Sequence, residues 1–180
     1  MQLTTERLRI EPLAEADIDA FTAYRRDPAI ARYQSWDPSY STADAARLVA
    51  GQPTTGLPAA GDWLQLALHD AADGRLVGDV AVHRLAGQPA TFEIGVTLAP
   101  AEHGRGLGGE AVTAVIDALF ATHGAHRVVA ECDARNDAVH ALLARAGMRQ
   151  ESRQVDADWF KGEWTTVDGF AVLRSEWLRR

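Results

Sequence analysis

Three glycines at fixed spacing are the first feature of the sequence with chemical meaning. Residues 102–109 read EHGRGLGG, so that Gly104, Gly106 and Gly109 follow the pattern G-x-G-x-x-G of turns that hold a dinucleotide pyrophosphate. An apolar stretch over 108–122 predicts a helix directly after them. The first turn of a helix has unpaired backbone N–H groups and a positive dipole end, and glycines let an anion approach them closely. The segment therefore predicts a phosphate-type anion site, with a glycine-rich turn that binds nothing as the alternative.

A nicotinamide dinucleotide is the first candidate ligand. Glu131 follows the glycines at about the sequence distance expected for the acidic residue that binds the ribose of such a cofactor. The surrounding sequence argues against it. Residues 99–102, which include Pro100, separate the glycines from the preceding strand. The segments upstream are typical of hairpins rather than of alternating strand–helix units. The glycine spacing alone leaves a nicotinamide cofactor and another pyrophosphate ligand both open.

The elements that must position this loop follow from hydrophobic periodicity and turn residues. Alternation of Leu8 and Ile10 with charged residues predicts a strand that ends near Pro12. Gly95 marks either a β-bulge or a close backbone approach, and Ser41 or Thr42 is expected to cap a helix. The sequence predicts strands over 63–70, 75–85, 91–98 and 126–132 and two more within 148–180, helices over 14–27, 41–51, 108–122 and 134–147, and loops over 33–41 and 52–61.

Composition indicates one globular domain over residues 1–180, because 47% of the residues are hydrophobic and no linker or repeat interrupts them. The net charge of −7 argues against non-specific nucleic-acid binding. The single cysteine, Cys132, excludes an internal disulfide and a cysteine-based zinc site. His69 and His83 lie on neighbouring strands without a third ligand at usable spacing, so no metal is expected. No apolar run indicates a signal peptide or a membrane span, and we expect a cytoplasmic protein without a membrane partner.

The stretch HGRGLG resembles the acetyl-CoA pyrophosphate loop of the GNAT N-acetyltransferases, with His103 at its usual Gln/Arg position and Gly106 and Gly108 at its small positions. The segments LTTERLRIEPL, FEIGVTLAPAEHGRGLGGEA, ARNDAVHALLARAGM and KGEWTTVDGFAVLRSEW resemble the RimJ/RimL-type branch, in the same order along nearly the whole chain. The resemblance implies an α/β (α+β) fold: a mixed, mostly antiparallel sheet flanked by helices. It also implies that the sheet splays between 91–98 and 126–132, at an acyl-CoA cleft.

The resemblance names acetyl-CoA as co-substrate. Its pantetheine arm would lie in the splay against the strand backbone, and its pyrophosphate would lie on the loop. Asn136 would contact the pantetheine, although Asn136 is equally well explained as a helix cap. The cofactor-binding residues expected on this basis are Val96, Leu98, His103, Gly104, Arg105, Gly106, Leu107, Gly108, Gly109 and Asn136.

The implied reaction is direct transfer of the acetyl group to a primary amine without a covalent intermediate. Glu93 is the best candidate base, with Asp79 as second choice and a purely structural carboxylate as the alternative. Related proteins carry a Tyr on the helix after Asn136, where this chain has Leu142 and Leu143. His140 is the remaining proton-donor candidate on that helix, unless it simply faces solvent.

Aromatic residues of the 33–41 loop are the candidates for substrate binding. Tyr33, Trp36 and Tyr40 can cage a cation or a ring, or can pack beneath the loop. The acceptor is then a protein N-terminal α-amine or a small molecule such as an aminoglycoside or a polyamine. Because the usual Tyr is missing, a non-catalytic acyl-CoA sensor is a further alternative. Homodimers are common among similar proteins.

Overall fold

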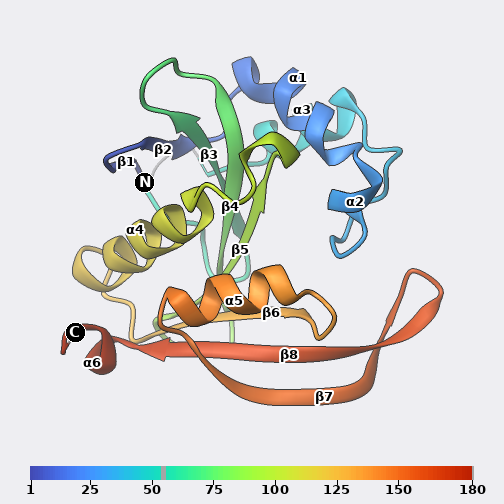
Figure 1. Ribbon diagram of the computed structural model, residues 1–180. Coiled ribbons are helices and arrows are strands. Elements are labelled where there is room, and N and C mark those ends of the chain that lie inside the picture. Colours follow the sequence, from blue (N-terminus) through green and yellow to red (C-terminus); the bar gives the residue numbers. More distant parts are fainter. Residues whose placement is uncertain (54–55, 180) are drawn as a thin grey trace.

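A computed structural model describes residues 1–53 and 56–179. The chain forms one eight-stranded sheet with the order β1-β2-β3-β4-β5-β6-β8-β7, in which only β5 and β6 are parallel neighbours (Figure 1). Residues 54–55 of the expected 52–61 loop lie outside the described residues. The strands are β1 (Leu3–Thr4), β2 (Leu8–Pro12), β3 (Trp63–Asp70), β4 (Leu76–Arg84), β5 (Thr91–Leu98), β6 (Arg127–Asp133), β7 (Arg149–Phe160) and β8 (Glu163–Leu173).

Helices cover both faces of this sheet. The long helix α4 packs in the main hydrophobic core, and α1 and α3 enclose a second, smaller core on the β3–β4 part of the sheet. Within the described residues, no helix combines the length and apolarity needed to cross a bilayer. The helices are α1 (Ile18–Arg25), α2 (Pro28–Ala31), α3 (Thr42–Ala50), α4 (Leu107–Ala121), α5 (Asp137–Arg145) and α6 (Arg174–Trp177), with short 3-10 turns η1 (Glu15–Asp17) and η2 (Pro100–Glu102).

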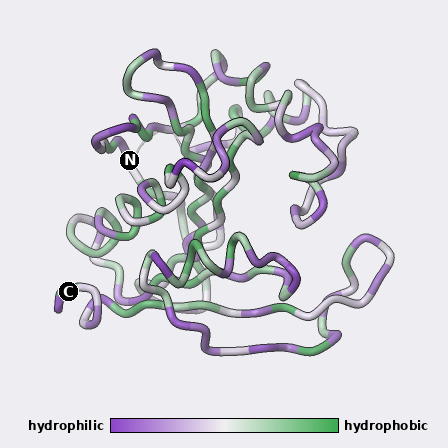
Figure 2. The backbone as a smooth tube through the Cα atoms, viewed as in Figure 1, coloured by the Kyte–Doolittle hydropathy of each residue, from purple (hydrophilic) through white to green (hydrophobic). Residues whose placement is uncertain are grey.

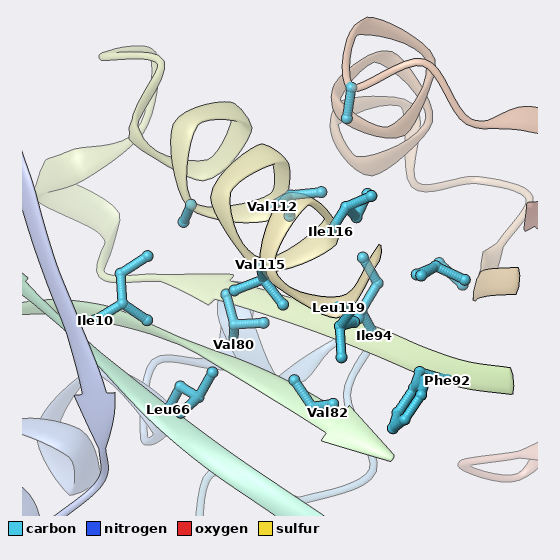
Figure 3. Packing of buried hydrophobic residues seen from close by; sticks show 14 of the residues in the cluster. Ile10, Leu66, Val80, Val82, Phe92, Ile94, Val112, Val115, Ile116 and Leu119 are labelled. Atoms are coloured by element: carbon cyan, nitrogen blue, oxygen red, sulfur yellow. The ribbon is translucent and has the colours of Figure 1, made fainter. Parts of the chain in front are cut away.

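The main core lies between α4 and the central strands. In Figure 3, Val112, Val115 and Leu119 of α4 point toward aliphatic side chains of β2, β3, β4 and β5. These side chains are almost fully buried, and each stabilises the fold by roughly 1.5–3 kcal/mol relative to exposure. Figure 2 shows the same concentration of hydrophobic residues in α4 and the central strands. The core therefore fixes the start of α4, and with it the glycine loop, against the end of β5.

The predicted mixed, mostly antiparallel sheet flanked by helices is confirmed, and two local predictions change. Pro28 does not merely end the first helix: it begins α2, where its missing N–H costs nothing and Asp27 caps the turn by accepting from Ala29 N at 2.8 Å. Neither the β-bulge nor the close backbone approach offered as alternatives at Gly95 is present. The β4–β5 register is continuous, and a Cβ at Gly95 would approach only Ala81 Cβ, at 3.9 Å. The predicted Ser41 cap is confirmed.

The expected splay of the sheet is present between β5 and β6. Their parallel pairing covers only Thr91–Glu93 against Arg127–Val129, and the strands then separate toward their carboxyl ends. The opening therefore begins immediately after Glu93, next to the start of α4.

Candidate active site

A slot occupies the splay between β5 and β6. It has a volume of about 80 Å³ and is lined by Gly95 and Val96 from β5, by Glu131 and Cys132 from β6, and by residues at the start of α5. Ala99 N donates to Val77 O of β4, so the odd-numbered backbone groups of β5 face β4 and the even-numbered ones face the slot. The backbone groups of Val96 are therefore directed toward the slot.

Leu98 and Asn136, both expected at this slot, already have partners in the protein. The Leu98 carbonyl accepts from His103 Nε2 at 3.0 Å, which ties the first residue of the loop to the end of β5. The Asn136 side chain accepts from Val139 N at 3.4 Å, which makes it the N-cap of α5, and it also lines the slot. Each residue thus holds the slot in shape, whatever it contributes to ligand binding.

The loop before α4 presents a row of backbone donors. The amides from Gly104 to Gly109 donate no hydrogen bond within residues 1–53 and 56–179. Gly104 and Gly106 have positive φ of 75° and 78°, a left-handed conformation that glycine adopts without strain. Together with the dipole of a 15-residue helix, these free amides suit the binding of an anion, which stays a prediction.

Buried Glu102 fixes one side of this loop. It is 2% exposed and accepts from Arg75 Nη1 at 2.5 Å and from Arg105 Nη1. The hydrogen bond from Arg75, assisted by the charge of Arg105, holds the pKa of Glu102 below its usual range. Arg105, which we expected to anchor a pyrophosphate, is therefore already engaged with a carboxylate, although its side chain remains half exposed.

Arg7, in the bend between β1 and β2, fixes the other side of the loop. Its Nη1 donates to Arg105 O at 2.7 Å, and its Nε donates to Glu110 Oε2 of α4 at 2.6 Å. Thr5 Oγ1 also donates to Glu110. No local sequence pattern predicts these contacts, because they join residues about 100 positions apart.

Two neighbouring glycines of α4 serve different purposes. A Cβ at Gly108 would lie 2.7 Å from Leu142 Cδ1 and 3.4 Å from Leu98 Cδ1, so a side chain there would force the Leu142 side chain to move. A Cβ at Gly109 would meet nothing within 4 Å. Leu107 is 1% exposed, so only its backbone is available to a ligand.

Glu93 lies on the sheet face opposite α4, at the point where the slot opens. Its Oε2 is 3.0 Å from His83 Nδ1 on β4, and the His83 ring stacks on Trp63 at a centroid distance of 4.4 Å. Sequence reasoning weighed His83 only as a metal ligand. Within the described part of the chain, no group of three or more His, Cys, Asp or Glu side chains is arranged to hold a metal ion.

A second, wider cavity of about 420 Å³ adjoins the slot and shares Tyr33, Glu131 and Cys132 with it. Asp158 of the β7–β8 hairpin lines its far side. Burial raises the pKa of Glu131, and the negative charges of Glu93 and Asp158 raise it further. Glu131 and Asp158 therefore face the wide cavity, and Glu93 lies close enough for its charge to act on Glu131. Asp133 also lines the cavity, but it is paired with Arg135. Sequence reasoning missed Glu131 and Asp158 in this role, although period-2 alternation along β6 was available to place Glu131.

Trp36 and Tyr40, expected to cage a substrate, surround an arginine of the chain itself. The Arg25 guanidinium carbon lies 3.6 Å from the centre of a Trp36 ring and 5.2 Å from that of Tyr40. Arg25 in turn lies 3.4 Å from Asp79, which also accepts from Tyr24. Asp79 is 2% exposed within this network, so the second-choice base has no access to a reactant. Of the three aromatic residues, Tyr33 alone lines the cavities.

His140 faces the sheet rather than solvent. Its Nε2 is 3.3 Å from Asp168 Oδ2 of β8, and its ring packs edge-on against Phe170. It is not part of the slot lining. Its role as proton donor stays a prediction, and its contacts favour a structural role.

Cys132 is the one thiol of the chain, and it lines the slot. Burial, together with nearby carboxylates, raises its pKa to about 12. Acyl transfer through a cysteine requires a thiolate, so this environment disfavours an acyl-cysteine intermediate and supports direct transfer.

We expect Cys132 in the folded protein to react with iodoacetamide at pH 8 about a thousandfold more slowly than an unperturbed cysteine, because its thiolate fraction is lower by that factor. Mass spectrometry of timed samples measures the rate, and the same protein in denaturant provides the fast reference. Equal rates in the two states would contradict the raised pKa.

The fold, the splayed sheet and the amide-lined loop define an acyl-CoA-dependent transferase. A family model described as an acetyltransferase (GNAT) domain matches residues 7–149. The chain therefore belongs to the GNAT acetyltransferase family and is an N-acetyltransferase that uses acetyl-CoA.

Individual proteins agree with this assignment. The chain is 26% identical over 180 residues to an uncharacterized N-acetyltransferase, YnaD, of Bacillus subtilis, covering 98% of this chain and 99% of that protein. A Vibrio cholerae spermidine N-acetyltransferase solved with CoA and spermine has a TM-score of 0.83 at 18% identity, covering 97% and 99% of the two chains. The ribosomal L7/L12 α-N-protein acetyltransferase RimL, solved with coenzyme A, has a TM-score of 0.81 at 15% identity, covering 96% and 98%.

Proposed function

We propose that the protein acetylates a primary amine on a small molecule that carries a second positive charge, as a polyamine or an aminoglycoside does. The observation that carries this proposal is the pair of carboxylates, Glu131 and Asp158, that lines the cavity beside the slot, with the charge of Glu93 close to Glu131. Such a cavity attracts a cation, and a bound cation lowers the cost of holding Glu131 ionised.

Acetyl-CoA supplies the acetyl group as a thioester. The loop amides from Gly104 to Gly109 hold its diphosphate, and the Val96 N–H polarises the thioester carbonyl. Glu93, oriented by His83, takes a proton from the ammonium of the acceptor, directly or through one water. The amine nitrogen then attacks the carbonyl carbon and the C–S bond breaks. The nitrogen releases its second proton to solvent, and the thiolate takes up a proton from solvent.

The need for a base depends on the acceptor. A lysine-like amine with a pKa near 10.4 is neutral about once in 2,500 at pH 7, whereas an α-amine near 7.8 is neutral about once in seven. A carboxylate that accepts a proton at the opening of the slot therefore increases the rate most for an alkylamine acceptor. The spermidine N-acetyltransferase of the same fold is in keeping with this choice, and RimL, an acetyltransferase of a protein α-amine, keeps the protein N-terminus as the rival acceptor.

The proposal is tested by thiol release from acetyl-CoA over a panel of spermidine, aminoglycosides, alkyl monoamines and N-terminal peptides. We expect turnover with the multiply charged amines. Turnover confined to peptides would replace the proposal by N-terminal acetylation and support the RimJ/RimL branch. Acetyl-CoA binding without any turnover would favour a sensor.

We expect Glu131→Gln to lower kcat/KM for spermidine about tenfold, because one charged contact with the second ammonium is lost. The same variant is expected to change kcat/KM for a monoamine of equal length less than about twofold, since that acceptor has no second charge. Steady-state kinetics with both amines measures the difference. Glu15→Gln, an exposed carboxylate on η1, is the charge-matched control. Equal losses for both amines would contradict the role of Glu131.

A further inference from the structure

Lys161 is the only lysine of the chain, and it occupies the tight turn between β7 and β8. Phe160 and Glu163 pair across this two-residue turn. Lys161 has a φ of +49° and Gly162 of +88°. Turns with two positive φ values favour Asn-Gly or Gly-Gly, and a lysine is uncommon at the first position. A residue that is poorly suited to its backbone conformation calls for a second reason, which its side chain supplies.

The ammonium of Lys161 bridges the hairpin to the loop after α2. Its Nζ donates to Ala31 O at 2.7 Å and to Trp36 O at 2.6 Å, and it lies 3.3 Å from Asp37 Oδ1. The three N–H donors of the ammonium thus have three oxygen partners on one short segment about 125–130 positions away. Lys161 therefore joins two segments that lie far apart in the chain.

These two segments are walls of the acidic cavity. Asp158 and Phe160 line it from the hairpin, and Tyr33 lines it from the segment that Lys161 holds. The β7–β8 register shifts between Gln154 and Asp158, and this irregularity bends the hairpin. Figure 1 shows the hairpin tip curling toward the side of the molecule on which α2 lies.

We propose that Lys161 is a positioning residue for the amine acceptor: its ammonium sets the separation between Tyr33 and Asp158, and with it the fit of the acceptor beside the slot. This inference rests on the proposed function. A weaker tie runs in parallel, from Tyr33 Oη to Arg135 O at 3.5 Å and from Arg135 to Glu163 at 2.9 Å. Loss of Lys161 therefore loosens the cavity wall without unfolding it.

The test compares Lys161→Met, which removes the ammonium, with Lys161→Arg, which keeps a cation able to reach the carbonyls. Arg149→Met is the matched control, because it removes one positive charge from β7 and touches Glu151 and Glu176 instead of the 32–41 loop. Two readouts are taken: amide hydrogen exchange of residues 32–41 in the free protein, and steady-state kinetics with spermidine and acetyl-CoA.

For Lys161→Met we expect amide exchange in 32–41 to quicken about tenfold. The KM for spermidine is expected to rise about tenfold, with kcat and the KM for acetyl-CoA within about twofold of the unmodified protein. Lys161→Arg is expected to recover most of both effects, and Arg149→Met to show neither. Unchanged exchange would overturn the inference whatever the acceptor is. Quickened exchange without spermidine turnover would leave the tie in place and count against the proposed acceptor.

Discussion

Replacing Gly109 by proline is expected to weaken acetyl-CoA binding at least about tenfold, since it deletes one backbone donor to a charged oxygen. Gly109 is the third residue of α4, so its N–H has no partner within the helix, and proline is tolerated in this turn. A side chain there meets nothing within 4 Å. The folded protein is therefore expected to keep its melting temperature within a few degrees. Calorimetric titration with acetyl-CoA measures the dissociation constant.

Gly109→Ala is the matched control for that experiment. It adds a Cβ at the same place but keeps the N–H, so we expect its affinity to stay within about twofold of the unmodified protein. If alanine and proline weaken binding equally, bulk rather than the lost amide is responsible. If neither weakens binding, the loop does not hold the diphosphate.

Glu93→Gln is expected to lower kcat for an alkylamine acceptor about a hundredfold at pH 7, because the amine loses its proton acceptor while the slot keeps its shape. The dissociation constant for acetyl-CoA is expected to change little. The deficit is expected to shrink as pH rises toward the pKa of the amine, since solvent then supplies the neutral form. Rates of thiol release from pH 7 to 10, with and without the substitution, measure this dependence.

Two further variants distinguish loss of the base from a general effect of removing a charge or a contact. Glu6→Gln, an exposed carboxylate outside the sheet, is expected to leave turnover unchanged. His83→Gln is expected to have a smaller effect than Glu93→Gln, because His83 acts through its contact with Glu93 Oε2. A Glu93→Gln deficit that stays constant with pH would indicate a structural role for Glu93 rather than proton transfer.

The sequence predicted those features that follow from residues close together in the chain. Glycines before an apolar run predicted the anion loop, and alternation predicted the strands. The splay and the slot required the resemblance to known acetyltransferases, because the place where two strands separate leaves no signature in either strand.

The remaining features depend on partners far apart in the chain. Nothing in the sequence around Glu102 predicted that it is buried. Its carboxylate is paired with Arg75, in the turn between β3 and β4. Trp36 and Tyr40 were expected to receive a substrate cation, but Arg25 is the cation that they contact. Asp158 lines the wide cavity directly after an irregularity in the β7–β8 register, which no pattern in the sequence of β7 indicates.

The imbalance between the two basic residue types has a consequence for an enzyme that handles a reactive thioester. Of the 18 Lys and Arg residues, 17 carry guanidinium groups, which stay protonated and are very poor nucleophiles toward acetyl groups. The lone side-chain amine is engaged by two carbonyls and a carboxylate. Among the basic side chains, the enzyme therefore offers one tethered amine that can compete with the incoming acceptor, so N-acetylation of its own side-chain amines over repeated turnovers is confined to Lys161.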